Sequence, residues 1–360
     1  MEDKLNVGII GVGNISPAYI NGSRAFDILN LVACADMNIP RAQQVAAENN
    51  LIAYSVDDLL ADPDIDIVIN LTVPLAHAAV SQLIIGAGKH VYSEKPLAVE
   101  LDDARRILDA AEAKGVRVGC APDTFLFSQH QTALKLLEEG AIGAPVAAFG
   151  AMAGRGPESW HPNADFFYKV GGGPMLDMGP YYVTCLLNLL GAAKRVTGSA
   201  RSSFPERVAK DGHRIDVEVP THVTGTIEFE SGAIATLVMS FDVMAHSMPQ
   251  MEVYGEYGTL RIPDPNGYKP REVMLFNGEW RVMPETYRSE WVRGIGLADM
   301  AYGILYGRPH RASGQLAYHA LEVMHAFATA SRTGQHVDIQ STIERPALLP
   351  VGLAARVLDR

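Results

Sequence analysis

A lysine between a glutamate and a proline is the segment of this sequence with the clearest capacity for proton transfer. Glu94-Lys95-Pro96 directly follows an apolar run at residues 90–92 that predicts a buried strand. Parallel α/β sheets place their ligands at the carboxyl ends of the strands, and burial lowers the pKa of a lysine toward the range in which it relays a hydroxyl proton. The alternative from these residues alone is a surface ion pair between Lys95 and Glu94.

A carboxylate and a phenol form the second candidate group. Asp177 and Tyr181 follow the glycine-rich residues 171–174, and their i, i+4 spacing puts them on one face of a helix. Together they can bind a polyol and share a proton, and Tyr182 lies next to them in the sequence. The structural alternative is that Asp177 caps the helix.

Three further residues are of types that hold sugars. Trp160 and His161 stand in Glu158-Ser159-Trp160-His161-Pro162, and Asp123 follows a predicted strand at residues 117–120. An aromatic ring offers a flat face, whereas carboxylate and imidazole groups offer directional hydrogen bonds. Single residues of these types are more often structural, so they support the two groups above and do not define a site alone.

A glycine turn after the first predicted strand indicates a dinucleotide site. Gly11-Val12-Gly13-Asn14-Ile15 follows the strand at residues 5–10, and its glycines let the backbone approach a pyrophosphate at a helix N-terminus. Ser16 replaces the third glycine of the usual pattern but is also small. Asp36, at the end of the second predicted strand, is placed to accept the ribose hydroxyls and to repel a 2′-phosphate. We expect NAD rather than NADP as the cofactor. Two alternatives stay open: Arg41 could bind the 2′-phosphate of NADP, and Asp36 could be a solvated residue at the end of its strand.

Alternating strands and helices position these residues. Short β-branched runs alternate with helical patterns over the first third of the chain, as in βαβ units around a parallel sheet. The predicted strands are residues 5–10, 31–35, 65–71, 90–92 and 117–120, and the predicted helices are residues 40–50, 57–61, 76–87 and 101–114. We predict an α/β Rossmann domain at residues 1–122.

The pattern changes after residue 140 to longer strands with alternating apolar and polar positions. These strands are residues 145–151, 195–202, 221–230 and 233–241, and helices are expected at residues 178–190 and 315–331. We predict an α+β domain at residues 123–360, with a large, mostly antiparallel sheet, for substrate binding and oligomerisation. The late helix at residues 315–331 is expected to pack back on the first domain.

Composition and charge exclude several functional classes. The chain has 360 residues, 41 acidic and 30 basic side chains, a formal net charge of −11 and no lysine- or arginine-rich run, so we expect no nucleic-acid partner. Cys34, Cys120 and Cys185 are isolated, which argues against disulfides and a metal site and favours a cytoplasmic location. No signal peptide is readable, no apolar run reaches the about 18 residues of a membrane span, and zinc-peptidase, P-loop and serine-hydrolase motifs are absent.

Taken together, these motifs resemble the glucose–fructose oxidoreductase, inositol dehydrogenase and rhizopine-catabolism (Gfo/Idh/MocA) family. The glycine turn, residues 74–77, Gly88-Lys89-His90-Val91 and Glu94-Lys95-Pro96 are similar to its cofactor domain. Gly172-Gly173 followed by Asp177-x-Gly179 is similar to its substrate helix, so the resemblance covers nearly the whole chain. One departure matters, because the family usually has a histidine four residues after the aspartate and this chain has Tyr181 there.

The resemblance implies an NAD(P)-dependent oxidoreductase that acts on a sugar, a cyclitol or a glycoside. The implied cofactor-binding residues are Gly11, Gly13, Asn14, Ile15, Asp36, Thr72, Pro74, His77, Glu94 and Lys95. The implied substrate-binding residues are Lys95, Asp123, Trp160, His161, Asp177, Tyr181 and Tyr182, of which Lys95, Asp177 and Tyr181 are catalytic. A tyrosine with an unperturbed pKa of about 10 is a poorer base at neutral pH than a histidine at about 6.5. We therefore assign the proton relay to Lys95 first, and Tyr181, Tyr182 and His161 stay open as its partner.

We predict that the chain oxidises a secondary hydroxyl to a ketone, or catalyses the reverse reduction, with hydride transfer between the substrate carbon and C4 of the nicotinamide. Two alternatives stay open: a redox-neutral lyase or glycosidase that oxidises its substrate only transiently, and a sugar-sensing regulator without turnover. Family likeness also implies a homodimer or homotetramer formed through the exposed face of the second sheet.

Overall fold

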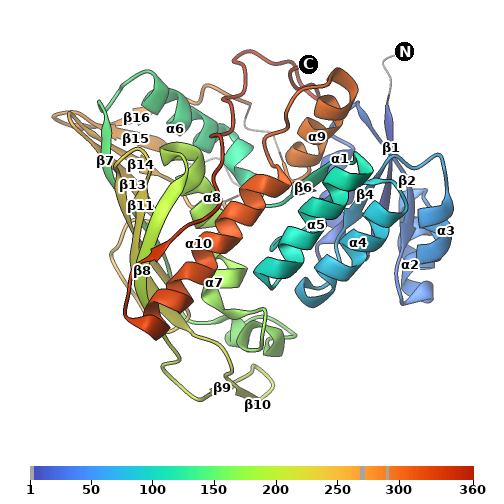
Figure 1. Cartoon of the computed structure of the whole chain (residues 1–360), viewed down its shortest axis with the longest axis horizontal. Helices are drawn as coiled ribbons and strands as arrows, with labels where there is room; N and C mark the ends of the chain where they lie inside the picture. Colours follow the sequence, from blue (N-terminus) through green and yellow to red (C-terminus); the bar gives the residue numbers. More distant parts are fainter. Residues whose placement is uncertain (1–3, 268–271, 289–291) are drawn as a thin grey trace. The chain divides into compact units, whose positions relative to one another are not determined.

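The computed structural model describes residues 4–267, 272–288 and 292–360, which form two compact units (Figure 1). The first unit takes its described residues from Met1–Phe127, Glu290–Tyr318 and Leu349–Arg360, and the second from Ser128–Ser289 and His319–Leu348. The chain therefore returns to the first unit twice, whereas the sequence analysis placed all of residues 123–360 in the second domain.

A six-stranded sheet forms the core of the first unit. Its strands are β1 (Leu5–Ile10), β2 (Leu29–Ala35), β3 (Ile52–Tyr54), β4 (Ile67–Asn70), β5 (His90–Ser93) and β6 (Val118–Cys120). The order across the sheet is β3-β2-β1-β4-β5-β6, and all neighbouring strands are parallel. This order is that of a Rossmann fold, so the predicted fold class of the N-terminal part is confirmed.

Helices connect these strands. They are α1 (Ser16–Ser23), α2 (Ile39–Asn49), α3 (Val56–Ala61), α4 (His77–Gly86) and α5 (Leu101–Lys114), with short 3-10 turns η1 (Pro74–Ala76) and η2 (Thr124–Leu126). A later helix, α9 (Ile295–Tyr306), packs against α1 and β6. Neither β3 nor α9 was predicted from the sequence. None of the three residues of β3 is buried, so it lacks the apolar character of the equally short β6. α9 is buried on every side from residue 295 to 303, so it lacks an amphipathic period.

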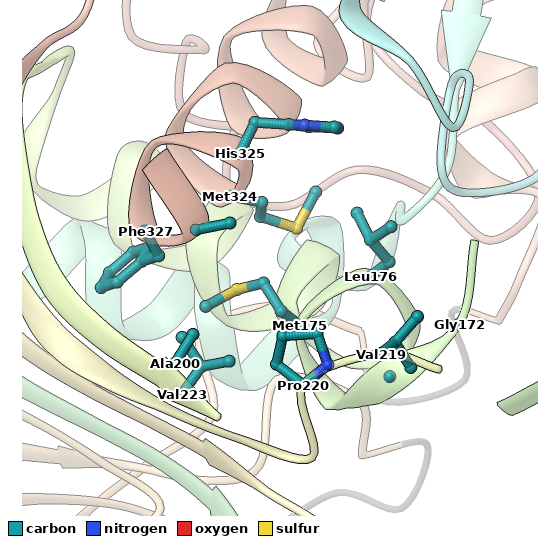
Figure 2. A pocket seen from close by; sticks show the side chains of 12 residues that line it. Gly172, Met175, Leu176, Ala200, Val219, Pro220, Val223, Met324, His325 and Phe327 are labelled. Atoms are coloured by element: carbon teal, nitrogen blue, oxygen red, sulfur yellow. The ribbon is translucent and has the colours of Figure 1, made fainter. Parts of the chain in front are cut away.

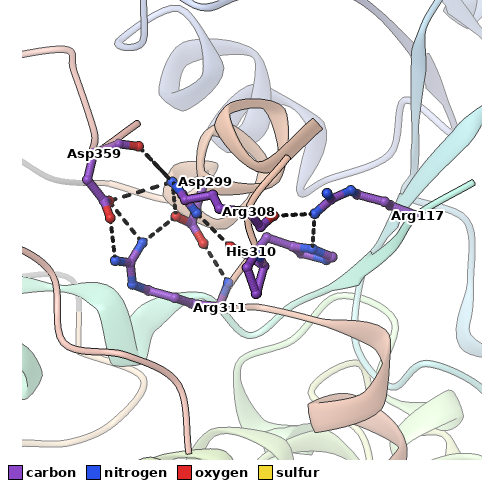
Figure 3. A network of polar contacts seen from close by, with 7 residues as sticks. Arg117, Asp299, Arg308, His310, Arg311 and Asp359 are labelled. Carbon is purple, nitrogen blue, oxygen red and sulfur yellow. Dashed lines mark hydrogen bonds and ion pairs between the residues drawn. The ribbon is translucent and has the colours of Figure 1, made fainter. Parts of the chain in front are cut away.

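A buried ionic network holds α9 to the chain segment that follows residue 349 in the first unit (Figure 3). The Asp299 carboxylate accepts hydrogen bonds from the guanidinium groups of Arg308 and Arg311 at 2.8 and 2.5 Å. Arg311 also forms an ion pair with Asp359 at 2.7 Å. These contacts explain why residues far beyond the Rossmann pattern belong to this unit.

The Asp359 carboxylate is expected to make the stability of the first unit depend on acid pH. Burial alone raises its pKa, but Arg311 and Arg308 outweigh that effect and hold the pKa below its ordinary value. A carboxyl group with a lowered folded-state pKa stabilises the fold above its unfolded-state pKa, and this contribution is lost as the pH falls through the folded-state value. In urea titrations between about pH 5 and pH 2, Asp359→Asn should therefore lose less stability than the unchanged chain. Equal losses in the two proteins would contradict this.

A nine-stranded sheet dominates the second unit. Its strands are β7 (Pro145–Ala153), β8 (Ala193–Arg201), β11 (His222–Phe229), β12 (Ile234–Ser240), β13 (Met251–Gly255), β14 (Thr259–Ile262), β15 (Val273–Phe276), β16 (Trp280–Met283) and β17 (Val337–Asp338). The order is β16-β15-β14-β13-β7-β12-β11-β8-β17, with β7 and β12 parallel and the other neighbours antiparallel. The predicted large, mostly antiparallel sheet is therefore confirmed. A separate hairpin consists of β9 (Glu206–Val208) and β10 (Arg214–Asp216).

Helices cover one face of this sheet where glycines let them approach. The helices of the unit are α6 (Ser128–Glu138), α7 (Gly173–Asp177), α8 (Gly179–Leu190) and most of α10 (Gly314–Thr333), with 3-10 turns η3 (Pro157–Ser159) and η4 (Asp165–Tyr168). Gly150, Gly225 and Gly198 lie in one row across β7, β12, β11 and β8 and so share a face. A Cβ atom on Gly198 would lie 2.7 Å from the Phe327 ring of α10, and one on Gly150 would lie 3.5 Å from the Tyr182 ring of α8. Both helices therefore pack on the same face.

Candidate active site

The glycine turn after β1 has the shape that a pyrophosphate requires. Gly11 has a φ of +93°, and a Cβ atom there would lie 2.8 Å from the backbone that follows β4, so the turn requires glycine. A Cβ atom on Gly13 would meet nothing within 4 Å. Ser16, which replaces the third glycine, is buried and donates its hydroxyl to the carbonyl oxygen of Gly13 at 2.8 Å. Asn14 is exposed, and the apolar Ile15 leaves the first N–H groups of α1 without a side-chain cap.

The Asp36 carboxylate lies beside this turn at the carboxyl end of β2. Its two oxygens accept hydrogen bonds from the backbone N–H groups of Val12 and Asn38, each at 2.8 Å. Arg41 is also close, since its Nε donates to the carbonyl oxygen of Val12 at 3.3 Å. The structure thus brings together the glycine turn and the carboxylate that were predicted to bind a dinucleotide, and it places the guanidinium considered as an alternative phosphate ligand at the same turn.

His77 joins the loops that follow β4 and β5. Its ring is 1% exposed, and its nitrogens lie 2.7 Å from the carbonyl oxygen of Pro96 and 3.0 Å from that of Thr72. Burial lowers the pKa of the imidazole. Pro74 begins the turn η1 between the two loops, and the Lys95–Pro96 peptide bond is cis. Four of the predicted cofactor residues therefore lie in neighbouring loops at the carboxyl edge of the sheet.

Glu94 is the centre of a buried polar cluster that the sequence analysis did not find. One carboxylate oxygen accepts hydrogen bonds from the Tyr19 hydroxyl and the Arg293 guanidinium, both at 2.8 Å, and the other accepts one from the backbone N–H of Lys95 at 2.9 Å. Burial alone raises the pKa of Glu94, but Arg293 and Lys95 hold it below its ordinary value. Glu94 is 7% exposed and is therefore not a surface carboxylate. Its charged form fixes the backbone on which Lys95 stands.

Asp123 is completely buried in the first unit. One of its oxygens accepts hydrogen bonds from the backbone N–H groups of Gly294 at 2.8 Å and Gly296 at 3.1 Å, at the start of α9. Burial raises the pKa of this carboxyl group more than Arg293 and the two N–H groups lower it. Asp123 therefore fixes the start of α9 in this structure. That Asp123 binds a substrate stays a prediction.

The Asp177 and Tyr181 pair lies at a junction between two helices of the second unit. α7 ends at Asp177 and α8 begins at Gly179, whereas a single helix from the intervening residue was predicted. Pro180, in the first turn of α8, has no N–H to donate to the preceding helix, which accounts for the break. Asp177 is half-buried, and Tyr181 is 4% exposed in the first turn of α8.

Tyr182 has a hydrogen-bond partner that the sequence analysis did not identify. Its hydroxyl donates to Asp264 at 3.2 Å, and the same carboxylate oxygen accepts the backbone N–H of Asn266 at 3.0 Å. Burial raises the pKa of the Tyr182 phenol, so this side chain stays protonated at neutral pH. The bond ties the start of α8 to the loop after β14.

Trp160 and His161 lie in an aromatic cluster between η3 and η4 of the second unit. The His161 ring makes edge contacts with Trp160, Phe166 and Phe167 at centroid distances of 5.4, 5.7 and 5.0 Å. Its Nδ1 lies 2.9 Å from the carbonyl oxygen of Asn163. Trp160 is 66% exposed, which leaves a flat apolar face available for a sugar ring.

Within residues 4–267, 272–288 and 292–360, no three His, Cys, Asp or Glu side chains are grouped so that they could hold a metal ion. No helix in these ranges is both long and apolar enough to cross a membrane.

Two family models together match more than half of the chain. A model described as "Oxidoreductase family, NAD-binding Rossmann fold" matches residues 5–121, and one described as "GFO/IDH/MocA C-terminal domain" matches residues 130–261. The first match includes Asp36 and Lys95, and the second includes Asp177 and Tyr181. The first unit therefore contains an NAD-binding Rossmann domain, and the chain is an oxidoreductase.

Known relatives also have oxidoreductase names. The chain is 29% identical over 260 residues to 1,5-anhydro-D-fructose reductase of Ensifer adhaerens, which covers 70% of this chain and 74% of the relative. It is 27% identical over 348 residues to inositol 2-dehydrogenase of Pseudomonas syringae pv. syringae. This match covers 93% of this chain and 96% of the relative. A levoglucosan dehydrogenase solved with NADH and L-sorbose matches with a TM-score of 0.82 and 21% identity over 94% of this chain and 99% of that chain. This last likeness shows a shared fold.

Proposed function

The chain belongs to the Gfo/Idh/MocA family of oxidoreductases, and we propose that it is an NAD-dependent dehydrogenase of a sugar, a glycoside or a cyclitol. It oxidises a secondary hydroxyl to a ketone or catalyses the reverse reduction. The names of its relatives, an anhydrosugar reductase and an inositol dehydrogenase, support this substrate class. The observation that carries the proposal is the position of Lys95 at the carboxyl end of β5, on a backbone fixed by a buried carboxylate at the edge of an NAD-binding sheet.

The residues of the first unit fit NAD. The space beside Gly13 and the uncapped start of α1 suit the pyrophosphate, and the Asp36 carboxylate suits the ribose hydroxyls. Thr72, Pro74 and His77 contribute the neighbouring loop. When bound, NAD supplies a hydride acceptor at C4 of the nicotinamide.

Lys95 is the proposed proton relay. Oxidation of an alcohol releases a hydride from the carbon and a proton from the hydroxyl, and a base in reach of that hydroxyl lowers the barrier. Lys95 accepts this proton at Nζ and passes it to solvent. The Glu94 carboxylate and the contact of His77 with Pro96 hold the loop on which this lysine stands.

Asp177 and Tyr181 are proposed to bind the substrate hydroxyls from the start of α8. A carboxylate accepts hydrogen bonds from two vicinal hydroxyls, and a protonated phenol donates one. Asp123, Trp160, His161 and Tyr182 are the further predicted substrate contacts.

The second sheet is proposed to form the interface of a homodimer or homotetramer. Ile234, Trp280 and Val282 are 48%, 39% and 49% exposed on the face opposite α8 and α10. They lie on β12 and β16, which four strands separate, and exposed apolar residues along one sheet face are typical of an association surface. Sedimentation of the purified protein as a monomer would contradict this assembly.

Reduction of NAD and NADP by the purified protein, tested against aldoses, glycosides, anhydrosugars and inositols, examines the proposed activity directly. We expect the nicotinamide absorbance to rise with one class of substrate, and the sugars are analysed afterwards. A cleaved or isomerised sugar without net cofactor reduction would instead indicate the redox-neutral enzyme. Cofactor binding with no change in any sugar would contradict a dehydrogenase of this class and favour a sensor.

Asp36→Ala is expected to reduce the preference for NAD. A hydrogen bond to a charged group contributes about 1.5–3 kcal/mol, so the ratio of kcat/KM for NAD to that for NADP should fall by about 10- to 100-fold. Asp57→Ala, which removes an exposed carboxylate from the first turn of α3, is the matched control and should leave the ratio unchanged. An unchanged ratio in Asp36→Ala would mean that Asp36 does not contact the ribose.

A further inference from the structure

An apolar pocket opens in the second unit beside the helix that carries Asp177 (Figure 2). Its volume is about 140 Å³. Its walls come from α7, from α10, from β8 and β11, and from the loop before β11, and they include Met175, Leu176, Val219, Met324, Phe327 and Ala328. Apart from His325, the side chains that line it are hydrocarbon or thioether.

The pocket is built partly from α7, the helix that ends at Asp177, although neither Asp177 nor Tyr181 is among its lining residues. Leu176 lines it, and Asp177 is the next residue, with its Cα about 3.8 Å away. The sulfur atoms of Met175 and Met324 pack over Gly179, since a Cβ atom there would lie 2.9 and 3.0 Å from them. Gly179 stands midway between Asp177 and Tyr181 in the sequence. The floor of the pocket is therefore built against the junction of α7 and α8.

The size and chemistry of the pocket indicate what fills it. An apolar cavity of about 150 Å³ holds a molecule the size of benzene. The hydroxyls of a free sugar placed against these walls would lose their hydrogen bonds to water without finding new partners. Met175 and Met324 are flexible and polarisable, so they adapt to apolar groups of different shape. An alkyl or aryl group fits these walls, whereas a polyol does not.

We propose that this pocket binds the apolar aglycone of a glycoside whose sugar ring is held by Asp177. The inference rests on the proposed function and narrows its substrate class to glycosides that carry an alkyl or aryl group of about six carbons. Free sugars and inositols fill only the polar part of such a site. The aglycone then contributes binding energy at a distance from the reacting carbon.

A series of alkyl glycosides tests the inference. With NAD as cofactor, kcat/KM should rise about threefold to fourfold for each added methylene from methyl to butyl to hexyl β-D-glucopyranoside, and then level off for octyl. The matching galactopyranosides provide a second sugar ring. A series that is flat or falls with chain length would overturn the inference while leaving the dehydrogenase activity established.

A variant that fills the pocket tests whether the dependence of kcat/KM on alkyl chain length arises there. Ala328 is exposed on α10 and lines the pocket, so Ala328→Phe adds bulk at its mouth without entering the core. The ratio of kcat/KM for the hexyl glycoside to that for the methyl glycoside should fall to about one. Arg332→Phe, one turn further along the same helix and also exposed, is the control and should keep the ratio of the unchanged chain. An undiminished ratio in Ala328→Phe would place the aglycone elsewhere.

Direct binding separates failure of this inference from failure of the proposed function. Saturation-transfer NMR with phenyl β-D-glucopyranoside and NAD needs no turnover. If no substrate reduces NAD, the proposed function fails, but strong transfer to the phenyl protons that Ala328→Phe abolishes would still support the pocket. Absence of transfer to the phenyl group would overturn the inference.

Discussion

Replacing Lys95 by alanine is expected to lower turnover by about 10²–10⁴-fold, the contribution typical of a general acid–base group. The substitution removes Nζ but keeps the backbone N–H that donates to the Glu94 carboxylate at 2.9 Å, so the loop after β5 should keep its position. The dissociation constant of NADH should therefore change little. Steady-state kinetics and a fluorescence titration of NADH measure these two quantities.

The controls for this experiment come from the same unit. Lys114 is exposed in the last turn of α5, and Lys114→Ala should behave like the unchanged chain. Added ethylamine should partly restore turnover in Lys95→Ala, because a free amine can supply the missing base. Near-normal turnover without the amine would remove Lys95 from the mechanism.

Much of the fold could be predicted because its signals are local. The first strand, at residues 5–10, and the helix at residues 101–114 have the predicted bounds, since each is a continuous run with a clear period and a polar or glycine boundary. β13 to β16 were not predicted, although β4 and β5 are equally short, because strands joined by loops lack the alternating helices that mark the βαβ units. The return of residues 290–318 to the first unit depends on contacts between distant segments, which a local pattern does not contain.

In the candidate site, too, residues with a local sequence signal could be predicted, whereas contacts between distant segments could not. The glycine turn, Asp36 and Lys95 could be placed because each directly follows a strand, and the carboxyl ends of parallel strands meet at one edge. Arg293 could not be linked to Glu94, because 199 residues separate them in the chain. Asp264 is likewise 82 residues from Tyr182. Nothing in the types or spacing of these residues indicates that they pair, since their contacts arise only when the chain folds.

Asp299→Ala is expected to lower the free energy of unfolding of the first unit by about 3–5 kcal/mol, because breaking a buried ion pair leaves an uncompensated charge. The Asp299 side chain is 0% exposed and accepts hydrogen bonds from two guanidinium groups and from the backbone N–H of Arg311 at 2.6 Å. Removing it leaves Arg308 and Arg311 with fewer acceptors, and their side chains are only 17% and 6% exposed, so water replaces little of the lost interaction. Native-state hydrogen exchange of amides in β6 and α9 reports the stability of this unit separately from the other.

Asp359→Ala is the matched control for this prediction. It removes the other carboxylate that binds Arg311, but its side chain is 21% exposed, so water can replace part of the lost interaction. We expect a smaller loss than for Asp299→Ala, and a double variant whose loss differs from the sum of the two, since both carboxylates share one guanidinium. A loss below about 1 kcal/mol in Asp299→Ala would mean that Arg308 and Arg311 find other acceptors, and that the network is not what holds α9 in the first unit.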